Sequence, residues 1–97
     1  MVERYKYEYH GWRITVYFNG YIRVNRKGED RLYAIGNISR IEQQAEYVFL
    51  YLTNGGFIQV KFEVSDFLVI DEFDENGEFV DSVGNWVFGE NNLVDSN

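Results

Sequence analysis

Alternation of apolar and polar residues runs through most of this chain, and glycine-bearing turns separate the alternating segments. A period of two places successive side chains on opposite faces of a β-strand, so the pattern predicts short antiparallel strands that bury one face. Residues 4–9 place three tyrosines on one face, and residues 12–17 do the same with Trp12, Ile14 and Val16. No proline is present to interrupt these segments.

Glycines set the expected register of two hairpins. A three-residue loop of Phe18-Asn19-Gly20, with Gly20 in the left-handed conformation, brings the apolar residues of both strands onto one face. This register pairs Tyr17 with Tyr21, Val16 with Ile22 and Ile14 with Val24. The same reasoning predicts a loop of Asn54-Gly55-Gly56, which pairs Leu52 with Ile58, Leu50 with Val60 and Val48 with Phe62. Phe49 and Tyr51 then point to the second face, which predicts that other elements or a partner partly cover it.

Residues 37–47 fit two structures. Ser39 followed by Glu42 matches a capping box, and Ile38, Ile41 and Ala45 recur at helical spacing, so we favour a short helix over a strand. Further on, "FLVI" at residues 67–70 predicts a strand buried on both faces, and Asn76-Gly77 predicts a two-residue hairpin turn.

These elements predict a single all-β domain over residues 1–90 and a frayed tail over residues 91–97. Six to eight short strands would form an antiparallel meander with at most one short helix. We expect the meander to curl into a small sandwich or a partly open barrel.

The composition argues against catalysis. Cysteine is absent and His10 is the only histidine, so neither a thiolate nucleophile nor a transition-metal site is expected. The serines occur in no nucleophile-elbow motif, and the glycines form no phosphate-binding pattern. An EF-hand alignment of residues 72–83 places Val83 where a bidentate glutamate belongs, which leaves a looser calcium site in the hairpin as an alternative. We expect a non-enzyme without a cofactor.

Because no segment resembles a signal peptide or a membrane span, we expect a cytoplasmic location and no membrane partner.

Charge is divided unequally along the chain. The net charge is −7, but residues 1–40 carry +4 and residues 41–97 carry −11. Residues 70–82 hold no basic residue and six carboxylates: Asp71, Glu72, Asp74, Glu75, Glu78 and Asp81. On a two-residue turn Glu75 faces Glu78 and Glu72 faces Asp81, and like charges opposite each other destabilise a sheet. We therefore interpret the six carboxylates as a partner-binding surface, with Phe73, Phe79 or Trp86 as aromatic anchors.

Carboxylates two residues apart on a strand are separated by about 6.6 Å, which is comparable with the charge spacing of a nucleic-acid strand. The hypothesis is a small acidic module that inhibits a basic, nucleic-acid-handling protein by charge mimicry. Small acidic β proteins of phages that block CRISPR effectors or restriction enzymes are similar in size and charge balance. This resemblance implies an anti-CRISPR or anti-restriction role. In the competing interpretation, the charges merely keep a sheet edge soluble and unpaired.

Three further alternatives stay open. Aromatic residues interleaved with arginines are typical of sheets that bind single-stranded nucleic acid, and such a set shares the outer face of the first predicted hairpin: Arg13, Tyr17, Tyr21 and Arg23. A toxin-immunity protein would also fit the acidic charge. Finally, exposed Tyr5, Tyr7 and Tyr9 would suit a homodimer interface.

Overall fold

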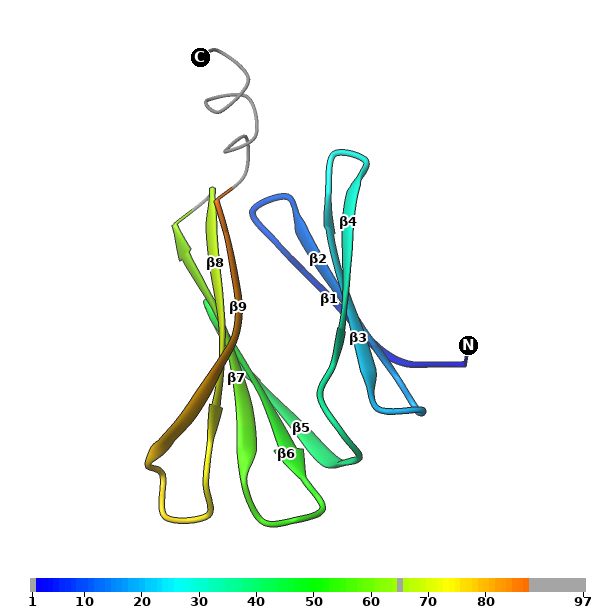
Figure 1. Ribbon diagram of the computed structural model, residues 1–97. Coiled ribbons are helices and arrows are strands. Elements are labelled where there is room, and N and C mark those ends of the chain that lie inside the picture. The colour runs from blue at the N-terminus through cyan, green and yellow to red at the C-terminus, as the bar shows by residue number, and fades with distance from the viewer. Residues whose placement is uncertain (1, 65, 88–97) are drawn as a thin grey trace.

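The computed structural model describes residues 2–64 and 66–87, which form two antiparallel sheets packed face to face (Figure 1). The first sheet has the order β1-β2-β3-β4, with β1 (Glu3–Tyr9), β2 (Trp12–Tyr17), β3 (Tyr21–Arg26) and β4 (Glu29–Ala34). The second has the order β5-β6-β7-β8-β9, with β5 (Ile38–Gln44), β6 (Tyr47–Leu52), β7 (Phe57–Val64), β8 (Phe67–Phe73) and β9 (Phe79–Val87). The all-β prediction is confirmed, and the two meanders form a sandwich. The predicted tail over residues 91–97 lies outside the described residues.

Strand β5 takes the place of the predicted helix. The register between β5 and β6 shifts between Ile38 and Arg40, so Ser39 is an extra residue in a β-bulge. Because of this bulge, Ile38 and Ile41 both pack against the core although they are three residues apart. The helix prediction was wrong because residues three apart share a face in a helical turn and also in a strand that carries a bulge between them. With β5 included, the described residues form nine strands rather than six to eight.

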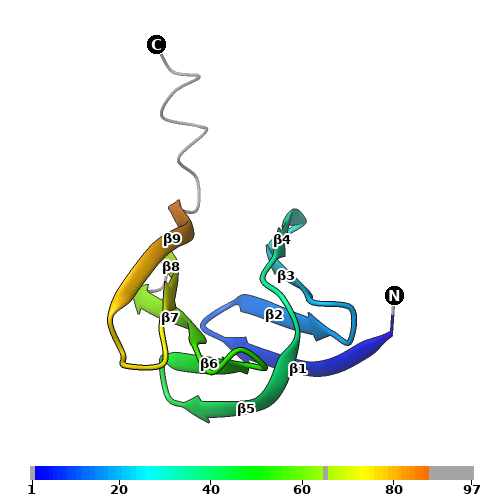
Figure 2. The same ribbon diagram turned by 60° about the horizontal axis from the view of Figure 1, so that its bottom comes forward.

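Figure 2 shows how the two sheets are arranged, and the core residues lie between them. Alternate residues of β2, β3, β6, β7 and β8 enter it, as a period of two requires. Trp12 of the first sheet meets Trp86 of the second edge to face, with ring centroids 5.1 Å apart. Trp86 is therefore a buried core residue, and its prediction as an aromatic anchor for a partner was wrong. Tyr7 and Tyr9 also face inward and contact Phe62, with ring centroids 6.1 and 5.7 Å away. The first-strand tyrosines are thus partly buried against the core, and the prediction of an exposed homodimer surface there is not supported.

The β2–β3 hairpin has the predicted register, with Val16 opposite Ile22 and Gly20 at a φ of 86°. The β6–β7 hairpin keeps the predicted faces but not the predicted partners, because Leu50 pairs with Ile58. Its loop is Thr53-Asn54-Gly55, and Gly55 is the left-handed residue, with a φ of 98°. A Cβ on Gly56 would lie 2.5 Å from the carbonyl oxygen of Phe73, so this glycine permits the close approach of β8 instead.

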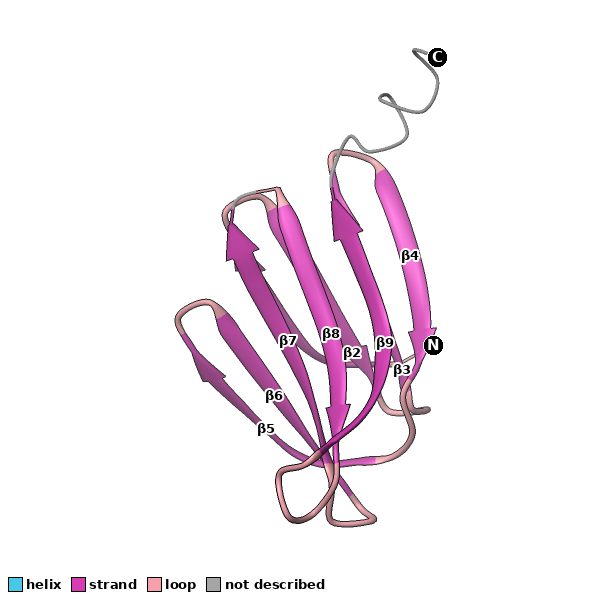
Figure 3. Cartoon of the chain, turned by 60° about the vertical axis from the view of Figure 1, so that its left-hand side comes forward, coloured by secondary structure: helices cyan, strands magenta, loops and turns pink. Residues whose placement is uncertain are grey.

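Side chains connect the two sheets along both edges. At the β1–β5 edge, the Arg4 guanidinium donates to the carbonyls of Ile38 and Ser39, at 2.6 and 2.9 Å. At the other edge, Figure 3 shows β4 and β9 side by side. There Arg31 donates to the carbonyl of Asn85 at 3.3 Å and lies over the Trp86 ring, 4.5 Å from its centroid. These hydrogen bonds use backbone carbonyls of the edge strands β5 and β9, which reduces the number that a strand of another chain could pair with.

Candidate functional site

The turn between β8 and β9 has a three-residue loop of Glu75-Asn76-Gly77, not the predicted two-residue turn. Asp74 N donates to the carbonyl of Glu78 at 2.9 Å, and Gly77 adopts a φ of 81°. The Asp74 carboxylate accepts from the amides of Asn76 and Glu78, at 2.8 and 2.9 Å. Asp74 therefore shapes the turn, and the predicted pairing of Glu75 with Glu78 is wrong.

The other predicted like-charge pair is confirmed, because Glu72 lies opposite Asp81. A register shift between Glu72 and Phe73 makes Val80 an extra residue in β9, which compensates for the longer loop. Phe73 and Phe79 face each other across the strands with ring centroids 6.1 Å apart. The structure thus brings the predicted partner-binding residues together in one hairpin.

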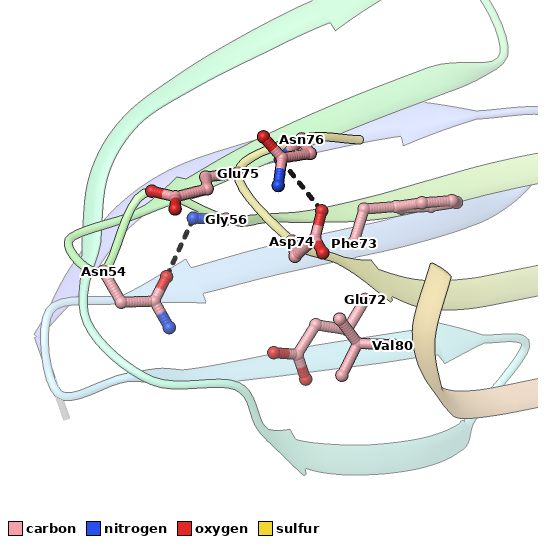
Figure 4. Close-up of a pocket in the computed structure, with 8 residues that line it drawn as sticks. All are labelled: Asn54, Gly56, Glu72, Phe73, Asp74, Glu75, Asn76 and Val80. Carbon is pink, nitrogen blue, oxygen red and sulfur yellow. Dashed lines mark hydrogen bonds between the residues drawn. The ribbon is translucent and has the colours of Figure 1, made fainter. Parts of the chain in front are cut away.

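Residues of this hairpin and of the β6–β7 loop together line a hollow of about 320 Å³. Figure 4 shows Glu72 and Val80 lying next to each other there, with the Phe73 ring pointing away from them. Its lining includes three carboxylates, those of Glu72, Asp74 and Glu75, and no basic side chain. An anionic ligand would be repelled from this hollow, whereas a cationic group would be attracted.

Ion pairing distinguishes the hairpin from the rest of the described chain. Outside it, six of the eight described acidic residues form ion pairs with lysine or arginine: Glu3, Glu8, Asp30, Glu42, Glu63 and Asp66. None of the six hairpin carboxylates forms an ion pair with a described basic residue. We call these six, Asp71, Glu72, Asp74, Glu75, Glu78 and Asp81, the acidic hairpin. Its charge is left for solvent or for a partner.

An aromatic row crosses the outer face of the second sheet from β6 to β9. The row contains six rings, those of Tyr47, Phe49, Tyr51, Phe57, Phe73 and Phe79. The rings that adjoin each other in it have centroids 5.0 to 6.2 Å apart, and both Phe49 and Tyr51 adjoin Phe57. The alternation in the sequence places Phe49 and Tyr51 outward, as predicted, but the role of Phe57 was missed. Phe57 connects the two halves of the row because it pairs with both Tyr51 and Phe73, which follows from the observed register.

Asp71 lies on this outer face, two residues from Phe73. Its cross-strand partners are Gln59 and Ser82, which are both uncharged. Partial burial raises the pKa of the Asp71 carboxyl above its usual range. Glu42 on the same face differs, since a hydrogen bond from Arg40 lowers its pKa.

The alternative nucleic-acid face of the first sheet is assembled but engaged internally. Arg13 donates to the Glu8 carboxylate at 2.7 Å, and Arg23 lies 3.5 Å from the Asp30 carboxylate and over the Tyr17 ring. Tyr17 is only 6% exposed, whereas Tyr21 is 39% exposed. These arginines would have to leave carboxylates in order to contact phosphates.

His10 occupies the β1–β2 turn with a φ of 48°, and its ring lies against Tyr9. In the part of the chain that the structure describes, no three His, Cys, Asp or Glu side chains come together as metal ligands. No helix among residues 2–64 and 66–87 has the length and apolar character needed to cross a membrane.

In comparisons with protein-family models, curated proteins and solved structures, nothing matches this chain.

Proposed function

We propose that this chain is a protein-binding module whose acidic hairpin occupies the basic groove of a nucleic-acid-handling protein. By mimicking phosphates it would inhibit that partner, in the manner of anti-CRISPR or anti-restriction proteins. The observation that carries the proposal is the contrast in ion pairing between the acidic hairpin and the other described carboxylates. Surface carboxylates that no internal cation neutralises can pair with a basic partner without first breaking internal contacts.

The distribution of charge between the sheets supports this proposal. Residues 1–37 carry seven basic and four acidic side chains, whereas residues 38–87 carry two basic and ten acidic ones. The field therefore points from one sheet to the other, and it would orient an approaching basic protein toward the second sheet. Arg4 and Arg31 contact backbone carbonyls and aromatic rings, so they do not neutralise the hairpin either.

The internal pairing of Arg13 and Arg23 favours this proposal over the nucleic-acid-binding alternative. Single-stranded DNA would meet arginines that already have carboxylate partners, and it would be repelled by the net charge of −7.

A fluorescent decalysine peptide provides a direct test of the acidic surface. We expect the wild-type protein to bind it, and affinity to fall steeply as salt is raised. The double variant Glu75→Gln/Glu78→Gln should weaken binding roughly two- to thirty-fold, because exposed charge pairs contribute about 0.2–1 kcal/mol each. Asp74 is left unchanged in this variant because it shapes the turn.

The matched control is Glu29→Gln/Glu46→Gln, which changes the net charge equally at two carboxylates without ion pairs in the described residues. It should bind decalysine nearly as well as the wild type. Equal losses in both variants would show that net charge alone acts, and the proposal would fail. Inhibition is measured separately, as DNA cleavage by purified CRISPR effectors and restriction endonucleases with each variant added.

A further inference from the structure

The outer face of the second sheet twice combines a basic residue, a carboxylate and an aromatic ring. On β5 and β6, Arg40 pairs across strands with Tyr51, with its guanidinium carbon 3.9 Å from the ring centroid and 2.7 Å between Arg40 Nη1 and Glu42 Oε1. On β6 and β7, Lys61 pairs with Tyr47, with its ammonium 5.6 Å from the ring centroid and 3.1 Å from Glu63 Oε2. In both places the carboxylate lies two residues beyond the base on the same strand.

A third group on this face has the carboxylate and the rings but no base. Asp71 lies two residues from Phe73 on β8, and Phe73 pairs across strands with Phe79. Among the described residues, no basic side chain lies over either ring and none pairs with Asp71. Phe79 is 60% exposed, so its ring is open to a partner.

We infer that Asp71, Phe73 and Phe79 form a binding site for an arginine side chain of the basic partner. This inference rests on the proposed function and specifies how the partner is recognised. The guanidinium would lie on the Phe79 ring and pair with Asp71, as Arg40 does with Tyr51 and Glu42. Arginine suits the site better than lysine, because its planar, weakly hydrated guanidinium stacks on rings and pairs with carboxylates in a fixed geometry.

The charge of this face selects among occupants. A second copy of the chain would bring ten acidic and two basic residues of its own second sheet against the same charges. A nucleic acid would bring phosphates against them as well. Both meet like-charge repulsion, whereas a basic protein is attracted. Pairing would also lower the pKa of the Asp71 carboxyl, which partial burial now raises.

The test compares decaarginine with decalysine, which carry equal charge. We expect the wild-type protein to bind decaarginine roughly two- to five-fold more tightly. Phe79→Leu and, separately, Asp71→Asn should abolish this preference while decalysine binding changes much less. The matched control is Phe18→Leu, because Phe18 is equally exposed, at 61%, but already has Arg4 over its ring. This control should keep the arginine preference.

A second readout is the pKa of Asp71, followed by carboxyl carbon NMR, which should fall when decaarginine is added and less when decalysine is added. Equal affinity for the two peptides, or a preference that survives Phe79→Leu, overturns the inference. If the Glu75→Gln/Glu78→Gln effect on decalysine persists in that case, the proposed function stands. Binding of neither peptide removes the proposed function and this site together.

Discussion

Gly84 lies where β9 passes the Tyr33 ring of β4, and this contact gives a sharp prediction about stability. A Cβ at position 84 would lie 2.6 Å from Tyr33 Cε1 and 3.1 Å from Cζ, closer than carbon atoms approach without a shift. Gly84→Ala should therefore lower the free energy of unfolding by about 1–3 kcal/mol, the usual cost of overpacking. For a chain of 97 residues, each kcal/mol corresponds to roughly 4–8 °C in melting temperature.

The cause of this loss is isolated by a double-mutant cycle with Tyr33→Ala. Removing the ring removes the overlap, so Gly84→Ala in that background should be neutral or stabilising by about 0.4–1 kcal/mol, through the lower entropy of the unfolded chain. Gly84 does not have a positive φ, so alanine fits its backbone. Urea unfolding followed by the fluorescence of the buried Trp12 and Trp86 measures all four proteins. An equal cost of Gly84→Ala in both backgrounds would refute the steric explanation.

Two further predictions concern the acidic hairpin. Asp74→Ala should lower the free energy of unfolding by about 1–2 kcal/mol, because two backbone amides lose their acceptor, whereas Asp74→Asn keeps the accepting oxygen and should cost less. Equal losses in urea unfolding would contradict this role. Because the folded pKa of Asp71 is raised, its contribution to stability is present below the usual aspartate pKa of about 3.9 and is lost as pH rises through the folded value. Asp71→Asn should therefore gain stability relative to the wild type at pH 7 but not at pH 3, and the same difference at both pH values would count against it.

The faces of the strands could be predicted because alternation is a local property. Val16 opposite Ile22 and the inward direction of Leu50 and Ile58 both follow from it. The register of β6–β7 could not be predicted, because either Gly55 or Gly56 could be the left-handed residue of the loop. In the observed register Gly55 is the left-handed residue and Gly56 lies against the carbonyl oxygen of Phe73, a contact between segments that are distant in the sequence.

The candidate site was visible in part. The sequence shows directly that residues 70–82 are rich in carboxylates. It does not show whether the basic residues of the first 40 positions neutralise them, because this depends on which side chains the fold brings together. The two-residue turn was a reasonable prediction for Asn76-Gly77, and the Asp74 carboxylate changes it by accepting two amide hydrogen bonds. The predicted hairpin already placed Ser82 opposite Asp71, but the neighbouring Gln59 required the observed register between β7 and β8.

Each strand of the described chain pairs only with strands that precede or follow it directly. All backbone ladders therefore close short loops, which costs little conformational entropy compared with the long connections of a Greek-key sandwich. We expect each meander to assemble within its own chain segment and the two layers to dock later through side chains. From this connectivity we expect the chain to fold rapidly for an all-β protein.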